Sequence, residues 1–185
     1  MSDESRFREL FEQTYTPVVR YAYNRGYRGA DAEDLVAATF EVAWRRLDAV
    51  PDGEHALPWL LAVSRNLNRN ASRRARRERG LIEPSVEPHD VAAAGDLADR
   101  VESREELLHA LGALKEIDRE LILLVARDGL DTAQAGEVLG FKPAAARTRL
   151  HRARNQLAGL LGAPTISERR STINGASATA AEERA

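Results

Sequence analysis

The sequence of 185 residues contains no cysteine. Disulfide bonds, thiolate catalysis and cysteine-based zinc sites are therefore excluded, and the composition fits a reducing compartment. The first residues are polar and lack the apolar segment of a secretory signal, and no apolar run approaches the length of a membrane span. We therefore expect a cytoplasmic protein.

Signals of catalysis are also absent. The four histidines are scattered and show no metal-ligand spacing. The sequence has no Gly-rich phosphate loop, no activated nucleophile and no pair of carboxylates in a plausible pocket. The acidic cluster at Asp31, Glu33 and Asp34 is explained by its place in the first turn of a helix, where carboxylates favour the positive end of the helix dipole. We expect no enzymatic activity, no metal and no cofactor.

No segment shows the alternating, β-branched pattern of a strand, whereas alanine, leucine and arginine are abundant. The sequence therefore predicts an all-α fold. Amphipathic patterns predict helices over 6–23, 31–48 and 58–79, and helical patterning resumes near Leu97. Pro17 predicts a kink or a break in the first helix, and Asp31 is the expected N-cap of the second.

Charge is segregated along the chain. The net charge is −2 and the pI about 6.1, which taken alone argues against a nucleic-acid-binding protein. Residues 65–79, however, hold seven arginines against a single acidic residue, Glu78, and residues 144–157 are also basic. Between these segments, residues 80–106 are predominantly acidic. Two basic patches are therefore available to a phosphate backbone, although the whole-chain charge hides them.

Residues 131–157 predict two short helices joined by a tight turn. Asp131 can cap the first helix with Gln134 as its capping-box partner, and Gly140 can end that helix. Pro143 suits the first turn of the second helix. The apolar positions of the second helix recur at helical spacing and are expected to face inward: Ala146, Leu150, Ala153 and Leu157.

The opposite face of this second helix is basic. The layout is that of a helix-turn-helix, whose second helix can enter a major groove. The alternative is an ordinary helical hairpin with a solvated basic face.

Several segments, taken in order, resemble the group 4 (extracytoplasmic-function) bacterial RNA polymerase sigma factors. They are DAEDLV at 31–36, TF at 39–40, AWR at 43–45, PWL at 58–60, AVSRN at 62–66 and RTRLHRAR at 147–154. The resemblance covers about residues 6–79 and 104–161. It implies two small helical domains joined by a flexible linker: a region 2-like unit (1–79), an acidic linker (80–103), a region 4-like helix-turn-helix unit (104–161) and a tail (162–185) that we expect to be disordered.

The resemblance also implies a function and partners. The chain would bind core RNA polymerase and direct promoter-specific initiation, with the N-terminal unit melting and reading the −10 element and the C-terminal unit reading the −35 element. The partners implied are core polymerase, promoter DNA and an anti-sigma factor or other regulator.

The resemblance implies three sets of contact residues. The expected polymerase-binding residues are Asp34, Leu35, Ala38, Thr39, Val42, Arg45 and Arg46. The expected −10 residues are His55, Trp59, Arg65, Asn66, Arg69, Arg73, Arg74, Arg76 and Arg77. The expected −35 residues are Arg147, Thr148, Arg149, His151, Arg152 and Arg154. Of these last, we expect Arg147, Thr148 and His151 to meet base edges and the other three to meet phosphates.

The sequence departs from the family pattern where small residues stand in place of larger ones. In the helix-turn-helix these are Ala135, Gly136, Ala145 and Ala146. They predict a looser and less stable unit. Elsewhere, Trp44 and Trp59 lie at core spacing, and we expect both to be buried.

Two alternative functions remain open. One is a free-standing helix-turn-helix regulator that binds duplex DNA without polymerase. The other is an interaction adaptor that does not bind promoters. The tail beyond Leu161 suggests a regulatory or partner-binding segment.

Overall fold

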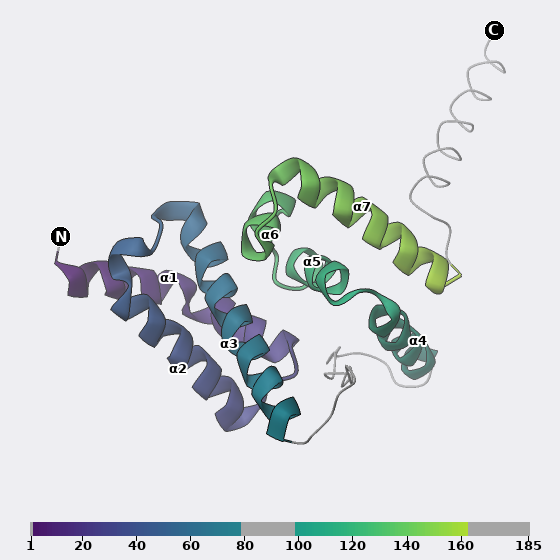
Figure 1. Cartoon of the computed structure of the whole chain (residues 1–185), viewed down its shortest axis with the longest axis horizontal. Coiled ribbons are helices and arrows are strands. Elements are labelled where there is room, and N and C mark those ends of the chain that lie inside the picture. Colours follow the sequence, from purple (N-terminus) through teal and green to yellow (C-terminus); the bar gives the residue numbers. More distant parts are fainter. Residues whose placement is uncertain (1, 79–98, 163–185) are drawn as a thin grey trace, which may run out of the picture.

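The computed structural model describes residues 2–78 and 99–162, with side chains given for 2–70 and 105–162. Every regular element in these ranges is helical, which confirms the all-α prediction (Figure 1). The N-terminal unit holds α1 (Asp3–Asn24), α2 (Gly29–Arg45), two 3₁₀ turns, η1 (Leu47–Ala49) and η2 (Gly53–His55), and α3 (Ala56–Glu78). The C-terminal unit holds α4 (Asp99–Ala113), α5 (Glu116–Ala126), α6 (Thr132–Leu139) and α7 (Pro143–Leu160).

The helices differ from the sequence-based expectation in several places, including the starts of α1 and α3 and the end of α2. Helix α1 runs through Pro17 without interruption, so a break there was wrong. Helix α2 begins two residues before Asp31 and has Arg28 as its N-cap, so Asp31 lies inside the first turn. Its carboxylate still complements the helix dipole from that position. Helix α4 begins at Asp99, within the predicted linker. The remainder of that linker (80–98) and the tail beyond residue 162 lie outside the described residues.

The three long helices of the N-terminal unit enclose an apolar core with one polar contact inside it. Thr39 of α2 and Ser64 of α3 are fully buried, and their hydroxyl oxygens lie 2.9 Å apart. Each hydroxyl also contacts the carbonyl four residues before it in its own helix. Both polar groups are therefore satisfied, as buried hydroxyls need to be, and they join α2 to α3.

The helix-turn-helix has the local structure that its sequence predicts. The Asp131 carboxylate accepts hydrogen bonds from the backbone N–H of Ala133 (2.7 Å) and Gln134 (2.8 Å), and the Gln134 side chain accepts from the Asp131 N–H (3.1 Å). Gly140 ends α6 in the left-handed conformation, with φ 74°. Pro143 is the first residue of α7. The capping box and the glycine stop are confirmed.

Replacing Asp131 with alanine is expected to lower the free energy of unfolding by about 1 kcal/mol, because two backbone N–H groups of α6 lose their acceptor. Urea unfolding followed by circular dichroism measures the change. Asp131→Asn is the matched control, since asparagine is a comparable N-cap. Equal losses in both variants would show that the capping hydrogen bonds are not the cause.

Small residues bring α6 and α7 into close contact. Gly136, Ala135 and Ala146 are buried, and a Cβ placed on Gly136 would lie 2.8 Å from the Cβ of Ala146. Ala145, by contrast, is exposed. Small side chains at 135, 136 and 146 therefore permit a close approach of the two helices, which is the opposite of the loose packing expected from them.

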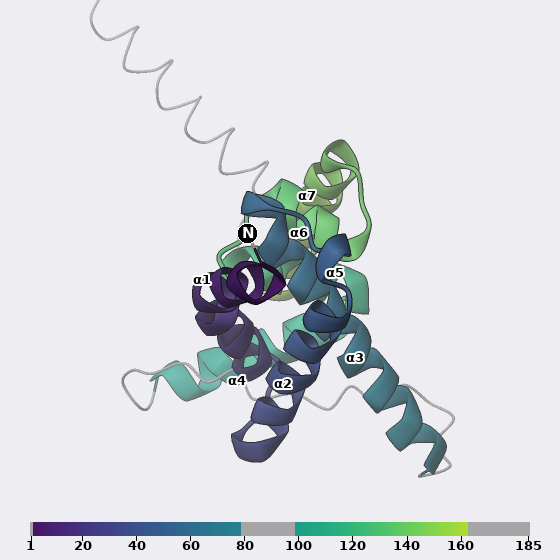
Figure 2. The ribbon, with the colours of Figure 1, turned by 90° about the vertical axis from the view of Figure 1, so that its left-hand side faces the viewer.

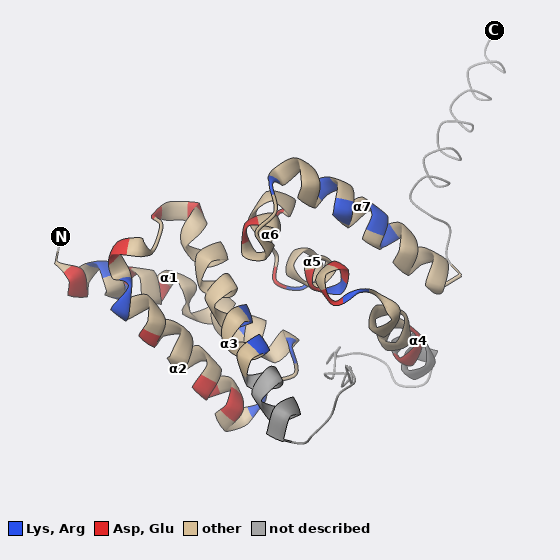
Figure 3. Cartoon of the chain, viewed as in Figure 1, with Lys and Arg blue, Asp and Glu red and all other residues tan. Residues whose placement is uncertain are grey.

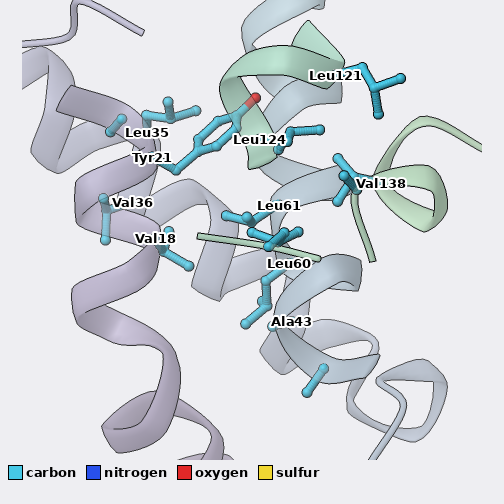
Figure 4. Packing of buried hydrophobic residues seen from close by; sticks show 14 of the residues in the cluster. Val18, Tyr21, Leu35, Val36, Ala43, Leu60, Leu61, Leu121, Leu124 and Val138 are labelled. Atoms are coloured by element: carbon cyan, nitrogen blue, oxygen red, sulfur yellow. The ribbon is translucent and has the colours of Figure 1, made fainter. Parts of the chain in front are cut away.

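The N- and C-terminal units are packed against each other. Helix α3 lies beside α6, as both ribbon views show (Figures 1 and 2). Buried residues from both units, among them Tyr21, Leu60, Leu61, Leu124 and Val138, belong to one cluster (Figure 4). The structure is therefore a closed arrangement with a shared core.

Candidate nucleic-acid interface

The outer face of α7 carries five exposed side chains that can meet nucleic acid. Its inner face is anchored by Ala146, Leu150 and Ala153, which are buried, and by the half-buried Leu157. Lysine and arginine positions gather along this helix (Figure 3). The exposed residues are Arg147, Thr148, His151, Arg152 and Arg154. A basic face on the second helix of a helix-turn-helix is the geometry that reads a major groove.

Arg149 is the exception on this helix. Its Nε donates to the Asp118 carboxylate of α5 at 2.6 Å, and its guanidinium lies 5.2 Å from the centroid of the Phe141 ring. Only 35% of the side chain is exposed. The expected phosphate contact does not fit these interactions, because the guanidinium is already engaged. Arg149 instead fixes α7 against α5.

A second basic surface begins on α3. Asn66 is exposed, whereas Arg65, Arg69 and Trp59 are half-buried. Trp59 packs against the core but is only partly buried, so the expectation of burial is met in part. The remaining arginines expected at the −10 element lie on the last turns of α3, where side chains are outside the described part of the chain: Arg73, Arg74, Arg76 and Arg77.

Two of the expected −10 residues face carboxylates of the C-terminal unit. His55 Nδ1 lies 2.9 Å from Glu137 of α6, and Arg69 Nε lies 3.5 Å from Glu116 of α5. The hydrogen bond and the charge of Glu137 raise the pKa of the exposed His55 imidazole, and Glu54 adds to this effect. These side chains are brought together only by the packing of the two units.

The outer face of α2 forms a separate surface. Arg45 and Arg46 are exposed and line a shallow hollow with Val42, while Asp34 is exposed and Ala38 is half-buried. Leu35 and Thr39, however, are buried, at 8% and 0% exposure. A direct partner contact by these two side chains does not fit their place in the core. They position the helix instead.

An aromatic patch was not anticipated as a surface feature. We define it as Phe7, Phe11 and Tyr15 of α1 with Trp44 of α2. Trp44 is 47% exposed, so the expectation that it lies in the core was wrong. Its ring centroid lies 5.1 Å from that of Phe7, and Phe11 lies 4.7 Å from the buried Phe40. The i, i+4 spacing of the three α1 aromatics was the available signal.

In the ranges 2–78 and 99–162 no helix is long and apolar enough to cross a membrane. Nor does this part of the chain contain three or more histidine or carboxylate side chains grouped so that they could hold a metal ion.

Comparison with protein families matches both units. The family described as Sigma-70 region 2 matches residues 10–78, and the family described as Sigma-70, region 4 matches residues 104–157.

Curated relatives extend over most of the chain. The RNA polymerase sigma factor CarQ of Myxococcus xanthus is 31% identical over 86% of this chain and 91% of its own length. The ECF RNA polymerase sigma factor EcfG of Rhodopseudomonas palustris is 31% identical over 70% of this chain and 71% of its own.

Solved structures share the fold. The sigma factor RpoE of Bartonella quintana, crystallised with the anti-sigma factor NepR, has a TM-score of 0.61 and 28% identity, covering 84% of this chain and 96% of that one. CnrH, solved with the cytosolic domain of CnrY, has a TM-score of 0.54 and 26% identity, covering 84% and 87% of the two chains.

Proposed function

The chain belongs to the extracytoplasmic-function (ECF) RNA polymerase sigma factors, and from that membership we propose how its surfaces divide the work of the family. As a sigma factor it directs promoter-specific transcription initiation by RNA polymerase. The assignment of each step to particular residues is our proposal. It treats residues 1–79 as the polymerase- and −10-binding unit and 104–161 as the −35-binding unit, joined by residues 80–103.

Helix α2 docks on core polymerase. The exposed Asp34, Arg45 and Arg46 and the half-buried Val42 supply a surface of mixed polar and apolar character. The aromatic patch adjoins this helix through Trp44. Aromatic and arginine side chains are enriched at the centres of protein interfaces, which supports a contact here.

The 3₁₀ turn η2 and the exposed face of α3 engage the −10 element. Single-stranded DNA is bound by stacking surfaces beside a basic groove. Trp59 lies near the start of α3 and Asn66 at its middle, and most of the arginines follow toward its end. This order supports base contacts at the N-terminal half of the helix and backbone contacts at the C-terminal half.

The observation that carries the proposal is the outer face of α7. Arg147, Thr148 and His151 contact base edges of the −35 element, and Arg152 and Arg154 contact phosphates. Arg149 holds the helix in place through Asp118. The support is that five polar or basic side chains are exposed on one face while the opposite face is buried in a capped helix-turn-helix.

The cellular setting follows from this function. Polymerase and promoter DNA are cytoplasmic in bacteria, so we place the protein there. A protein that performs these steps needs no catalytic site of its own. Two of the similar structures were solved with bound partners, an anti-sigma factor in one and the cytosolic domain of CnrY in the other, and we propose a regulator of the anti-sigma class for this chain as well.

Run-off transcription from a promoter library tests the proposal. Bacterial core polymerase is assayed with and without the protein over a series of salt concentrations. We expect promoter-specific transcripts that need both components and that decrease steeply with salt, because arginine–phosphate contacts release counterions. A protein that yields no transcript but shifts duplex DNA by itself would be a free-standing regulator. One that does neither would be an adaptor.

A further inference from the structure

Arg6 of α1 joins the first helix to the α2–α3 connection, which we define as residues 46–55. Its Nη1 donates to the Leu47 carbonyl oxygen at 3.0 Å, and its Nη2 donates to the Val50 carbonyl oxygen at 2.8 Å and to the Asp52 carboxylate at 2.9 Å. The acceptors lie 41 to 46 residues away in the sequence. One guanidinium therefore holds three successive points of the connection.

The α1 end of this contact is anchored in the core of the N-terminal unit. Arg6 is followed by Phe7, whose ring lies edge-on to the rings of Phe40 and Trp44, with centroids 6.4 and 5.1 Å away. One turn further along α1, Leu10 is buried. The guanidinium therefore extends from a helix whose position does not depend on the connection.

The connection has few apolar anchors of its own. Leu47 and Val50 are buried, at 7% and 4% exposure, whereas residues 52–55 are all exposed. A Cβ added at Gly53 would meet nothing within 4 Å, so this point stands away from the rest of the described chain. The exposed segment, which includes the turn η2, therefore leaves the core directly after the residues whose carbonyls Arg6 contacts.

The two carbonyl contacts restrain the connection more than the ion pair does. The Asp52 side chain is 90% exposed, and exposed ion pairs contribute little because water competes for both charges. The carbonyls of Leu47 and Val50, by contrast, belong to buried residues, and only 29% of the Arg6 side chain is exposed. Hydrogen bonds from a charged guanidinium are strong and directional. Those to the carbonyls therefore fix the path of the backbone itself.

A direct contact between Arg6 and DNA does not fit this geometry. Both terminal nitrogens of the guanidinium already donate to acceptors within the protein. A phosphate would have to displace these acceptors before it could bind. Arg6 therefore acts on the connection and not on DNA.

We propose that Arg6 is a positioning residue for −10 recognition: through the carbonyls of Leu47 and Val50 it holds the connection so that η2 and the start of α3 meet the −10 bases in one fixed geometry. The inference rests on the proposed function, because it takes η2 and α3 as the surface that reads this element. A displacement of about 1 Å is enough to spoil such a site, so base discrimination depends on how firmly the loop is held.

Arg6→Met tests this role, because methionine keeps an apolar stem on α1 and removes every donor. Single-round transcription with bacterial core polymerase is compared between a preferred −10 sequence and its single-base variants. We expect the ratio to fall about tenfold, since one base contact supplies discrimination of this order. Preference at the −35 element should stay unaltered, because the other unit reads it.

Two further variants separate the carbonyl contacts from charge. Arg8→Met is the matched control, since it makes the same substitution at an exposed arginine of the same helix. It should leave −10 discrimination unaltered. Asp52→Asn removes only the ion pair and should reduce discrimination by less than about twofold. Losses in either variant as large as that in Arg6→Met would overturn positioning through the carbonyls.

Hydrogen exchange of backbone amides measures the connection without polymerase or DNA. The amides of Ala49, Val50 and Ala56 donate to carbonyls of the connection and its flanks. We expect Arg6→Met to speed their exchange about tenfold, the effect of losing roughly one hydrogen bond from a charged group. Amides in the middle of α2 should exchange at the same rate as in the unaltered protein, which shows that the unit remains folded.

The outcomes distinguish this inference from the proposed function. Undiminished −10 discrimination by Arg6→Met, or unaltered exchange of the connection amides, would overturn the positioning role. An equal loss of −10 and −35 preference would also overturn it, because a loop held at one end of the N-terminal unit affects one element only. Failure of the proposed function is seen separately, since the unaltered protein would then give no promoter-dependent transcript.

Discussion

Replacing Arg147 and Arg152 with alanine is expected to reduce promoter-directed transcription by about 10- to 100-fold. An arginine that contacts a base edge contributes roughly 1–3 kcal/mol to the free energy of DNA binding. A phosphate contact contributes less, and its contribution is about the same for every DNA sequence. Both side chains are exposed on the outer face of α7, and neither belongs to the core of the unit. Their loss should therefore remove DNA contacts while leaving the fold unaltered.

Single-round transcription from a selected promoter measures this effect, and a salt series separates the two roles. Arg152→Ala should reduce the slope of log affinity against log salt by about 1, whereas Arg147→Ala should relax preference at one −35 position. Lys115→Ala is the control, since it removes an exposed basic side chain from the same unit but not from α7. Undiminished transcription by the double variant would favour the adaptor function.

Gly136→Ala is expected to lower the free energy of unfolding by about 1–3 kcal/mol, the usual cost of forcing an extra methyl group into a packed core. The added Cβ would lie 2.8 Å from the Ala146 Cβ and 3.2 Å from the backbone oxygen of Phe141. The backbone oxygen of Phe141 cannot move aside as the end of a flexible side chain can. Helices α6 and α7 would have to separate, and the DNA-reading face would shift with them.

Thermal unfolding followed by circular dichroism measures the loss, and Gly159→Ala is the matched control. Gly159 lies in α7, and a Cβ added to it would meet nothing within 4 Å. Alanine there should leave stability unaltered or raise it by up to about 1 kcal/mol, because alanine favours a helix over glycine. Equal stability of Gly136→Ala and the unaltered protein would contradict the close contact between α6 and α7.

Local structure was predictable because its causes lie within a few residues of one another. The capping box of Asp131 with Gln134 and the stop at Gly140 depend on hydrogen bonds and backbone angles inside α6 and its ends. The inward positions of α7 follow from helical periodicity. The break considered at Pro17 did not occur, since α1 is continuous from Asp3 to Asn24.

The roles of individual side chains were less predictable, since they depend on what packs beside a helix. Periodicity placed Trp44 in the core, but the neighbouring aromatics of α1 share the surface with it and leave it half exposed. Leu35 and Thr39 lie on the helix expected to dock on polymerase, yet α3 covers part of that helix, as the Thr39–Ser64 contact shows. Arg149 resembles its basic neighbours in the sequence, but in the fold Asp118 engages it.

The sequence by itself determined the helical class, the two units, the helix-turn-helix and the family, because propensity, caps and short motifs are properties of neighbouring residues. Only the tertiary structure decided which face of each helix is exposed to solvent. It also decided that the two units pack against each other. Arg25 meets Glu120 and Asp128 across about 100 residues of chain. No local pattern encodes that meeting, since it depends on the shape and burial of two complete surfaces.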